Sequence, residues 1–237
     1  MIFIISGVVL NPRLRKILYV ILWYIIYPQL VYMWLVSDVF QSPENLLMVS
    51  ALVMSYFVGA LDTYFRPFSD SISDDWETST VYNLILLGLF IFHPFLVVLA
   101  FKENQMFIVS SFPLLNKAHV SVTGILLILI GGIVTVTGRA QLSRFGSGIL
   151  QIEDDHSLIT TGIYEYVRHP IYAGGLLGII GIYLAFRSLL TLTAVTILYF
   201  LIMRHRIGFE EEMLIKEFGD EYKNYMKKTK KLIPYVY

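Results

Sequence analysis

Long apolar segments separated by short polar ones dominate the first 140 residues. A helix needs roughly 20 apolar residues to cross about 30 Å of hydrocarbon, and four segments approach that length. They are residues 17–36, 46–61, 81–101 and 120–138. Because lipid offers no partner to backbone polar groups, a spanning segment must satisfy its own hydrogen bonds. The pattern therefore predicts four membrane-spanning helices.

A fifth apolar block, residues 171–203, contains Arg187 and Ser188 near its middle. Each half of the block holds about 16 residues, which is short for a full crossing. A charge at the bilayer centre is costly, whereas a charge at a turn can reach the interface. The block therefore predicts two short helices in a hairpin. The expected fold class is an all-α, polytopic membrane bundle with about six transmembrane helices.

Residues 204–234 mix charged and aromatic positions. Leu214, Phe218 and Tyr222 recur one helical turn apart, while lysines and acidic residues fill the positions between them. This pattern predicts a cytoplasmic amphipathic helix after the hairpin. The chain divides on this basis into N-terminal transmembrane helices, residues 1–138, and a motif-dense C-terminal region, residues 139–237.

Composition places the chain in lipid. Hydrophobic residues make up 56% of the 237 residues and charged residues 15%, with a mean hydropathy of +0.66. The 18 Lys and Arg residues balance 18 Asp and Glu residues, so net charge gives no case for a nucleic-acid partner. There is no cysteine, and the five histidines form no metal-spaced cluster, so no metal is expected.

Positive residues predict the orientation of the helices. The first apolar segment carries no signal-peptide pattern, so the chain is expected to be retained in the membrane. An even number of crossings places positive residues near both ends of the chain on one side: Arg13, Arg15, Lys16, Arg139, Arg144, Arg168, Arg204 and Arg206. Both termini are therefore expected to be cytoplasmic.

Two features inside the apolar helices have structural interpretations. Gly131, Gly132 and Gly138 predict close helix packing, a common use of small residues in membranes. His93 precedes Pro94, and this pair predicts a local kink in the helix. A role for His93 as a ligand is not expected, because no second His or acidic residue lies at helical spacing.

Polar and turn-forming residues gather directly before the predicted hairpin, at residues 151–172. Gly162 permits a tight turn, and Pro170 suits the first turn of a helix because its missing N–H is not needed there. Arg168 and His169 then lie at the N-terminus of that helix, where an anionic group of a ligand is stabilised. The alternative is that both residues form only a charged flank at the membrane interface.

Arg206 and Glu210 are four residues apart, on one helix face just beyond the last apolar segment. One interpretation is an exposed ion pair that contributes under about 1 kcal/mol. The other is a cation that orients an anionic acceptor, beside a carboxylate that binds a polar ligand. The residue spacing leaves both open.

Three blocks of residues carry a resemblance to a known family. The first is His156-Ser157-Leu158-Ile159 with Gly162-Ile163-Tyr164, and the second is Arg168-His169-Pro170-Ile171-Tyr172. The third is Glu210-Glu211 with Leu214, Phe218-Gly219, Tyr222, Tyr225 and Pro234. In order and spacing, these blocks resemble the catalytic region of the isoprenylcysteine carboxyl methyltransferase family and of its relatives, the membrane phospholipid and thiol methyltransferases.

The resemblance implies that S-adenosylmethionine is bound on the cytoplasmic side and converted to S-adenosylhomocysteine. Residues 139–237 would form the cofactor-binding catalytic region, and residues 1–138 the acceptor side. Arg206 would be the catalytic residue and would bind the acceptor. The residues implied to bind the cofactor are Gln151, His156, Ser157, Leu158, Ile159, Tyr164, His169, Pro170, Ile171, Tyr172 and Glu210.

The implied reaction is methyl transfer to a lipophilic acceptor that enters from the bilayer, such as the carboxylate of an isoprenylcysteine. A phospholipid or thiol acceptor stays open. A different enzyme class also shares the Arg-His-Pro-x-Tyr element, namely the NADPH-dependent membrane sterol reductases. Those enzymes usually have Asn where this chain has Ile171, and they lack the paired glutamates before Leu214. These departures favour methyl transfer.

Overall fold

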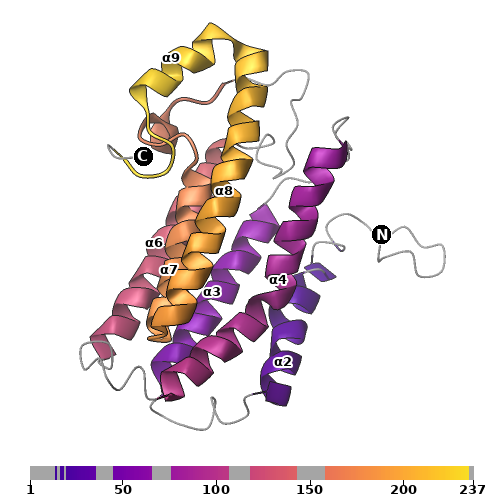
Figure 1. The fold of residues 1–237 in the computed structure, drawn as a ribbon, viewed down its shortest axis with the longest axis vertical. Coiled ribbons are helices and arrows are strands. Elements are labelled where there is room, and N and C mark those ends of the chain that lie inside the picture. The colour runs from indigo at the N-terminus through magenta and orange to yellow at the C-terminus, as the bar shows by residue number, and fades with distance from the viewer. Residues whose placement is uncertain are drawn as a thin grey trace, which may run out of the picture.

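The computed structural model describes residues 14, 17–18, 20–35, 45–65, 76–106, 118–142 and 158–234, and these residues are predominantly helical. The helices run side by side as an elongated bundle, and α9 lies across one end of it (Figure 1). In chain order they are η1 (Ile21–Ile26), α2 (Tyr27–Leu35), α3 (Leu46–Phe65), α4 (Trp76–Gln105), α6 (Ala118–Leu142), η5 (Gly162–Glu165), α7 (Pro170–Ala185), α8 (Leu189–Phe218) and α9 (Asp220–Lys228).

The protein is an integral membrane protein, as the apolar pattern predicts. Three helices in the described part of the chain are long and apolar enough to span a bilayer: Leu46–Tyr64, Ala118–Leu142 and Leu189–Phe218. Two shorter apolar helices, Ile21–Tyr32 and Pro170–Ala185, lie beside them. Helices thus occur at every predicted apolar segment and extend a few residues past most of the predicted ends. The total of six crossings stays a prediction.

The hairpin turn falls where the sequence predicts it. Helix α7 ends at Ala185 and α8 begins at Leu189, so Arg187 and Ser188 form the connection. Arg187 has φ of 56°, a left-handed conformation that non-glycine residues adopt mainly in turns and caps. Helix α8 differs from the prediction in length. The whole helix is 30 residues long and includes the charged positions after Met203. It ends before Gly219, where φ is 53°, because no strong helix breaker occurs earlier.

Close packing of α6 against α7 depends on glycine, as predicted for the small residues of α6. A Cβ on Gly131 would lie 2.5 Å from the carbonyl oxygen of Gly174, and a Cβ on Gly124 would lie 2.4 Å from that of Gly181. The two backbones therefore approach to a distance that excludes any larger side chain. Gly138 continues this contact at the start of α7, where it faces Pro170.

Two carboxylates join the N-terminal helices to the C-terminal ones. Asp62 of α3 receives two hydrogen bonds from the buried guanidinium of Arg139 on α6, one of them 3.1 Å between Nη2 and Oδ2. Glu103 of α4 accepts hydrogen bonds at the start of α8, from the Ser188 hydroxyl and from the Thr191 backbone N–H and hydroxyl. The Asp62–Arg139 ion pair and the hydrogen bonds to Glu103 therefore hold these helices at fixed positions along one another.

Candidate functional site

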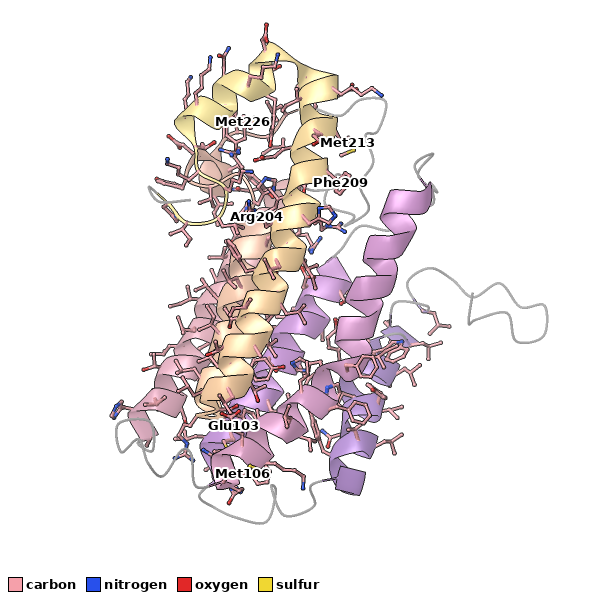
Figure 2. All side chains as sticks on the ribbon, viewed as in Figure 1. Glu103, Met106, Arg204, Phe209, Met213 and Met226 are labelled. Carbon is pink, nitrogen blue, oxygen red and sulfur yellow. The ribbon has the colours of Figure 1, made fainter. Side chains whose placement is uncertain are left out.

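Polar side chains gather at the end of the bundle that α9 covers. Figure 2 shows Arg204, Phe209, Met213 and Met226 at this end, opposite the end that carries Glu103. Three segments meet here: residues 158–169 before α7, the last turns of α8, and α9 with the strand-like segment after it. The backbone N–H groups of Arg168 and His169 donate to the carbonyls of Lys230 and Lys231 at 2.8 and 3.0 Å. The C-terminal segment is thereby fixed against the start of α7.

The turn before α7 follows the sequence prediction. Gly162 has φ of 63°, and a Cβ there would also collide with the side chain of Gln141. Pro170 occupies the first turn of α7, and its ring packs against Gly138. The preceding residue, His169, is the N-cap of the helix, but its side chain does not cap the helix. The imidazole ring therefore remains available for contacts with α8.

Arg168 is a buried structural residue. Its Nε donates to Glu211 Oε1 at 2.9 Å, and its Nη1 donates to the carbonyls of Met226 and Thr229 at the end of α9. Carbonyls at a helix C-terminus have no partner within the helix, so a cation stabilises them. The interpretation of Arg168 as an exposed interfacial flank is wrong, because the side chain is buried and contacts the protein's own Glu211. An anionic ligand group at the N-terminus of α7 stays a prediction.

The adjacent glutamates of α8 differ sharply in their partners. Glu211 is buried and is contacted by three side chains: Arg168, His169 Nε2 at 3.3 Å and Lys231 Nζ at 2.9 Å. Glu210 has a side chain that is 25% exposed, and its Oε2 lies 3.7 Å from His169 Nδ1. That oxygen is itself buried and has no hydrogen-bond partner. Glu211 is therefore satisfied within the fold, whereas Glu210 is not.

Two tyrosines surround Glu210. The Tyr172 ring stacks on the ring of His169, with centroids 5.8 Å apart and an interplanar angle of 19°. Tyr164 is buried, and its hydroxyl donates to the carbonyl of Gly138 at 3.2 Å. Burial, and after it the charge of Glu210, raises the pKa of the Tyr164 hydroxyl, which therefore stays protonated. The site is thus aromatic around a carboxylate that lacks a full set of partners.

Arg206 lies on the same side of α8 as Glu210. It is only 4% exposed, and its Nε donates to the Tyr172 hydroxyl at 2.7 Å. Its guanidinium carbon lies 5.8 Å from the centroid of that ring. The interpretation of Arg206 as one half of an exposed ion pair is therefore wrong, because this side chain is buried and is oriented by Tyr172.

The structure brings most of the predicted site residues together. Tyr164, His169, Tyr172, Glu210 and Arg206 share one region, and Pro170 and Ile171 form the first turn of α7 beside it. Leu158 and Ile159 are half-buried in the segment before η5. Gln151, His156 and Ser157 lie outside the described residues. In the described part of the chain, no group of three or more metal-ligating side chains could hold a metal ion.

Sequence reasoning missed the structural role of two residues that it had quoted as part of the motifs, Arg168 and Glu211. The signal for Glu211 was present, because a second carboxylate directly after Glu210 must point to a different side of the helix. Its three partners come from positions 168, 169 and 231, and residue spacing gives no indication of these contacts.

Comparison with known proteins identifies the relatives of this region. Residues 119–221 match the family described as phospholipid methyltransferase. A probable protein-S-isoprenylcysteine O-methyltransferase of Oryza sativa subsp. indica is 31% identical over 119 residues, which are 49% of this chain and 62% of that protein. The protein-S-isoprenylcysteine O-methyltransferase of Tribolium castaneum is 30% identical over 128 residues, which are 53% of this chain and 46% of that protein.

A solved structure extends the likeness to most of the chain. It is that of a eukaryotic intramembrane Ras methyltransferase, an isoprenylcysteine carboxyl methyltransferase, with a TM-score of 0.62 and 21% sequence identity. The match covers 93% of this chain and 75% of that one. At this identity it shows the fold alone, and it places the protein among polytopic membrane proteins with this helical architecture.

The resemblance to the isoprenylcysteine carboxyl methyltransferase family is confirmed by these matches. The family match covers residues 119–221, in the C-terminal half, and the chain spans less than two thirds of the length of either named relative. The described geometry adds what the matches do not give, namely which of the motif residues hold the fold and which of them lack partners within it.

Proposed function

We propose that this protein is an integral membrane methyltransferase that transfers a methyl group from S-adenosylmethionine to a lipophilic acceptor. The acceptor that the site suits best is the carboxylate of an isoprenylcysteine-like substrate. The observation that carries the proposal is the buried, unpartnered Oε2 of Glu210, surrounded by Tyr164, His169 and Tyr172. A native fold rarely leaves a buried carboxylate oxygen without a hydrogen-bond partner, and a bound ligand would supply one here.

The residues around Glu210 fit S-adenosylmethionine. The carboxylate of Glu210 would accept hydrogen bonds from the amino group or the ribose hydroxyls. Tyr172 offers an aromatic face beside a polar group, which suits a ligand with both an adenine ring and a charged tail. Leu158, Ile159, Pro170 and Ile171 would form the apolar wall. Gln151, His156 and Ser157 remain part of the prediction.

The cofactor, when bound, supplies an activated methyl group on a sulfonium centre, so the protein has only to align the reactants and exclude water. Arg206 would bind the carboxylate of the acceptor by parallel hydrogen bonds. Its hydrogen bond to Tyr172 holds the guanidinium in one orientation. A carboxylate is ionised at neutral pH, so it needs no general base to become a nucleophile. Burial of Arg206 strengthens its interaction with an anion.

The arrangement of helices supports a division of labour along the chain. Residues 139–237 would bind the cofactor, and the helices within residues 1–138 would admit the acceptor from the bilayer. Both termini and the site would lie on the cytoplasmic side, where the positive residues gather. In support of this, the polar residues of the site lie at one end of apolar helices, where a water-soluble cofactor and a lipid-soluble acceptor can meet.

The test is to incubate the purified protein with methyl-labelled S-adenosylmethionine and an S-farnesylcysteine derivative, and to identify the product by mass. A base-labile methyl ester on the cysteine carboxylate is expected. Phospholipid acceptors form the second arm, because the family matched by residues 119–221 is described by that activity. If the label appeared on a phospholipid head group, the acceptor would be a phospholipid, and the proposed methyl transfer would still stand. Binding of NADPH with no binding of S-adenosylhomocysteine would overturn the proposal.

A further inference from the structure

A second buried polar atom without a partner lies close to the site, on a helix to which the sequence motifs assign no ligand. Tyr222 of α9 is 1% exposed, and its hydroxyl has no hydrogen-bond partner. The Tyr222 ring packs edge-on against Tyr225, with centroids 5.8 Å apart. A buried tyrosine hydroxyl is normally hydrogen-bonded, so this one requires an explanation.

Arg168 links α9 to the paired glutamates, because its guanidinium contacts Glu211 and the carbonyls of Met226 and Thr229. Burial raises the pKa of Tyr222, and the charges of Glu211 and Glu210 raise it further. Glu211 is satisfied by Arg168, His169 and Lys231, whereas Glu210 Oε2 lacks a partner. The Tyr222 hydroxyl, a donor, and Glu210 Oε2, an acceptor, are thus both buried and both without a hydrogen-bond partner.

The position of Tyr222 is fixed by its neighbours on α9. The Tyr225 hydroxyl donates to the carbonyl of Tyr164 at 2.6 Å, and Arg168 binds the carbonyls of Met226 and Thr229. Helix α9 is therefore attached to the segment before α7 at two points, Tyr164 and Arg168. Such attachment holds the Tyr222 hydroxyl in place before any ligand arrives, which lowers the entropic cost of binding.

From this geometry we infer that Tyr222 is a cofactor-binding residue, and that its hydroxyl donates a hydrogen bond to an oxygen of S-adenosylmethionine while Glu210 accepts one. Helix α9 is then part of the binding site as well as its cover. This inference rests on the proposed function and adds a residue to it. It explains why the fold tolerates an unpartnered hydroxyl at this position, since the bound cofactor supplies the missing acceptor.

The experiment compares Tyr222→Phe with Tyr183→Phe in the purified, full-length protein. Tyr183 is a matched control, because it is also fully buried with an unpartnered hydroxyl. It lies 11 residues beyond Tyr172 on α7, about 16 Å along the helix axis. Titration calorimetry with S-adenosylhomocysteine is expected to show about fivefold to twentyfold weaker binding for Tyr222→Phe and unchanged binding for Tyr183→Phe.

The thermal midpoint without ligand separates a binding role from a structural one. Tyr222→Phe is expected to unfold at the same temperature as the wild type, because no internal hydrogen bond is lost. A lower midpoint without ligand, or wild-type affinity in the variant, would overturn the inference. Hydrogen exchange of the wild-type protein is a second measurement that needs no variant. S-adenosylhomocysteine should slow exchange in residues 220–228, and unchanged exchange there would also overturn it.

Failure of the inference and failure of the proposed function give different results. If the wild-type protein gives no heat with S-adenosylhomocysteine, the proposed function fails and Tyr222 loses its ligand with it. If the wild type binds and Tyr222→Phe binds equally well, the methyltransferase proposal stands and only the role of Tyr222 is rejected.

Discussion

Glutamate side chains lie at both ends of the α7–α8 hairpin, and the two ends differ in how completely these carboxylates are hydrogen-bonded. At the turn, Glu103 accepts four hydrogen bonds, from the Ser188 hydroxyl, the Leu190 N–H, and the Thr191 N–H and hydroxyl. At the open end, Glu211 is equally satisfied, but its neighbour Glu210 keeps a buried oxygen without a partner.

Under the proposed function, this difference separates structural carboxylates from a ligand-binding one. Residue type is the same at both ends, and Glu103 and Glu211 are equally buried, so neither property identifies the site. What distinguishes Glu210 is incomplete hydrogen bonding, which a fold retains where a ligand completes it. Five substitutions test the distinction, and they are ordered here by the free energy each is expected to change.

Glu211→Ala is expected to have the largest effect. It would leave Arg168 and His169 buried without their carboxylate, which costs about 3–5 kcal/mol of stability. The C-terminal segment after α9 should also lose protection from hydrogen exchange, because Lys231 loses its partner. Equilibrium unfolding in detergent and exchange of residues 229–234 measure both effects. If stability were unchanged and only cofactor affinity fell, Glu211 would belong with Glu210 as a ligand-binding residue.

Arg206→Ala is expected to lower turnover by about 10²–10³-fold, because it removes a preorganised cation from the acceptor. Cofactor affinity should change little, since Arg206 is assigned to the acceptor and Glu210 to the cofactor. Initial rates with labelled cofactor, and calorimetry with S-adenosylhomocysteine, separate the two. Arg206→Lys is the matched control, and it should recover only part of the rate because an ammonium cannot form two parallel bonds. Weak cofactor binding with normal turnover would reverse the role assignment.

Glu103→Ala is expected to destabilise the protein by about 2–3 kcal/mol. The first backbone N–H groups of α8 would lose their acceptor in a buried position. The surviving folded protein should bind the cofactor with normal affinity, because Glu103 lies at the opposite end of the hairpin (Figure 2). Thermal unfolding with and without S-adenosylhomocysteine measures this. A loss of affinity in the folded fraction would mean that the two ends are coupled.

Glu210→Gln should weaken S-adenosylhomocysteine binding by about tenfold and leave the stability of the ligand-free protein nearly unchanged. The substitution keeps the shape of the side chain and removes a charge-assisted acceptor, which contributes about 1.5–3 kcal/mol when it is used. Calorimetry and thermal unfolding, run beside Glu211→Gln, show whether the two glutamates differ as their partners indicate. Equal loss of stability in both variants would contradict the comparison.

The sequence predicts the local features of this fold well. Apolar length located the helices, Arg187 and Ser188 marked the hairpin turn, and Gly162 and Pro170 marked the entry to α7. Each of these signals acts through neighbouring residues. The length of α8 was harder to predict, because charged residues after Met203 indicate the end of the apolar segment but do not end a helix.

The division of roles within the site could not be predicted. Glu210 and Glu211 are chemically identical neighbours, and only their contacts with residues about 20 to 40 positions away distinguish them. Likewise, the acceptors for the Arg168 guanidinium lie 43 to 61 residues further along the chain. The motif identifies the residues of the candidate site, but the arrangement of their partners depends on how α9 folds back.

Tyr225→Phe is expected to have the smallest effect, and it distinguishes a structural tyrosine of α9 from Tyr222. The Tyr225 hydroxyl donates to the Tyr164 carbonyl at 2.6 Å, and burial raises its pKa to about 12, so it remains a donor at neutral pH. Loss of this bond should lower the stability of the ligand-free protein by about 1 kcal/mol. Cofactor affinity should fall less than in Tyr222→Phe, because Tyr225 acts only by attaching α9 to the turn before α7. Tyr225→Phe should therefore lose more stability than Tyr222→Phe in thermal unfolding, and Tyr222→Phe should lose more cofactor affinity in calorimetry. If one variant lost more of both, α9 would act as a whole, with no individual contact between a side chain and the ligand.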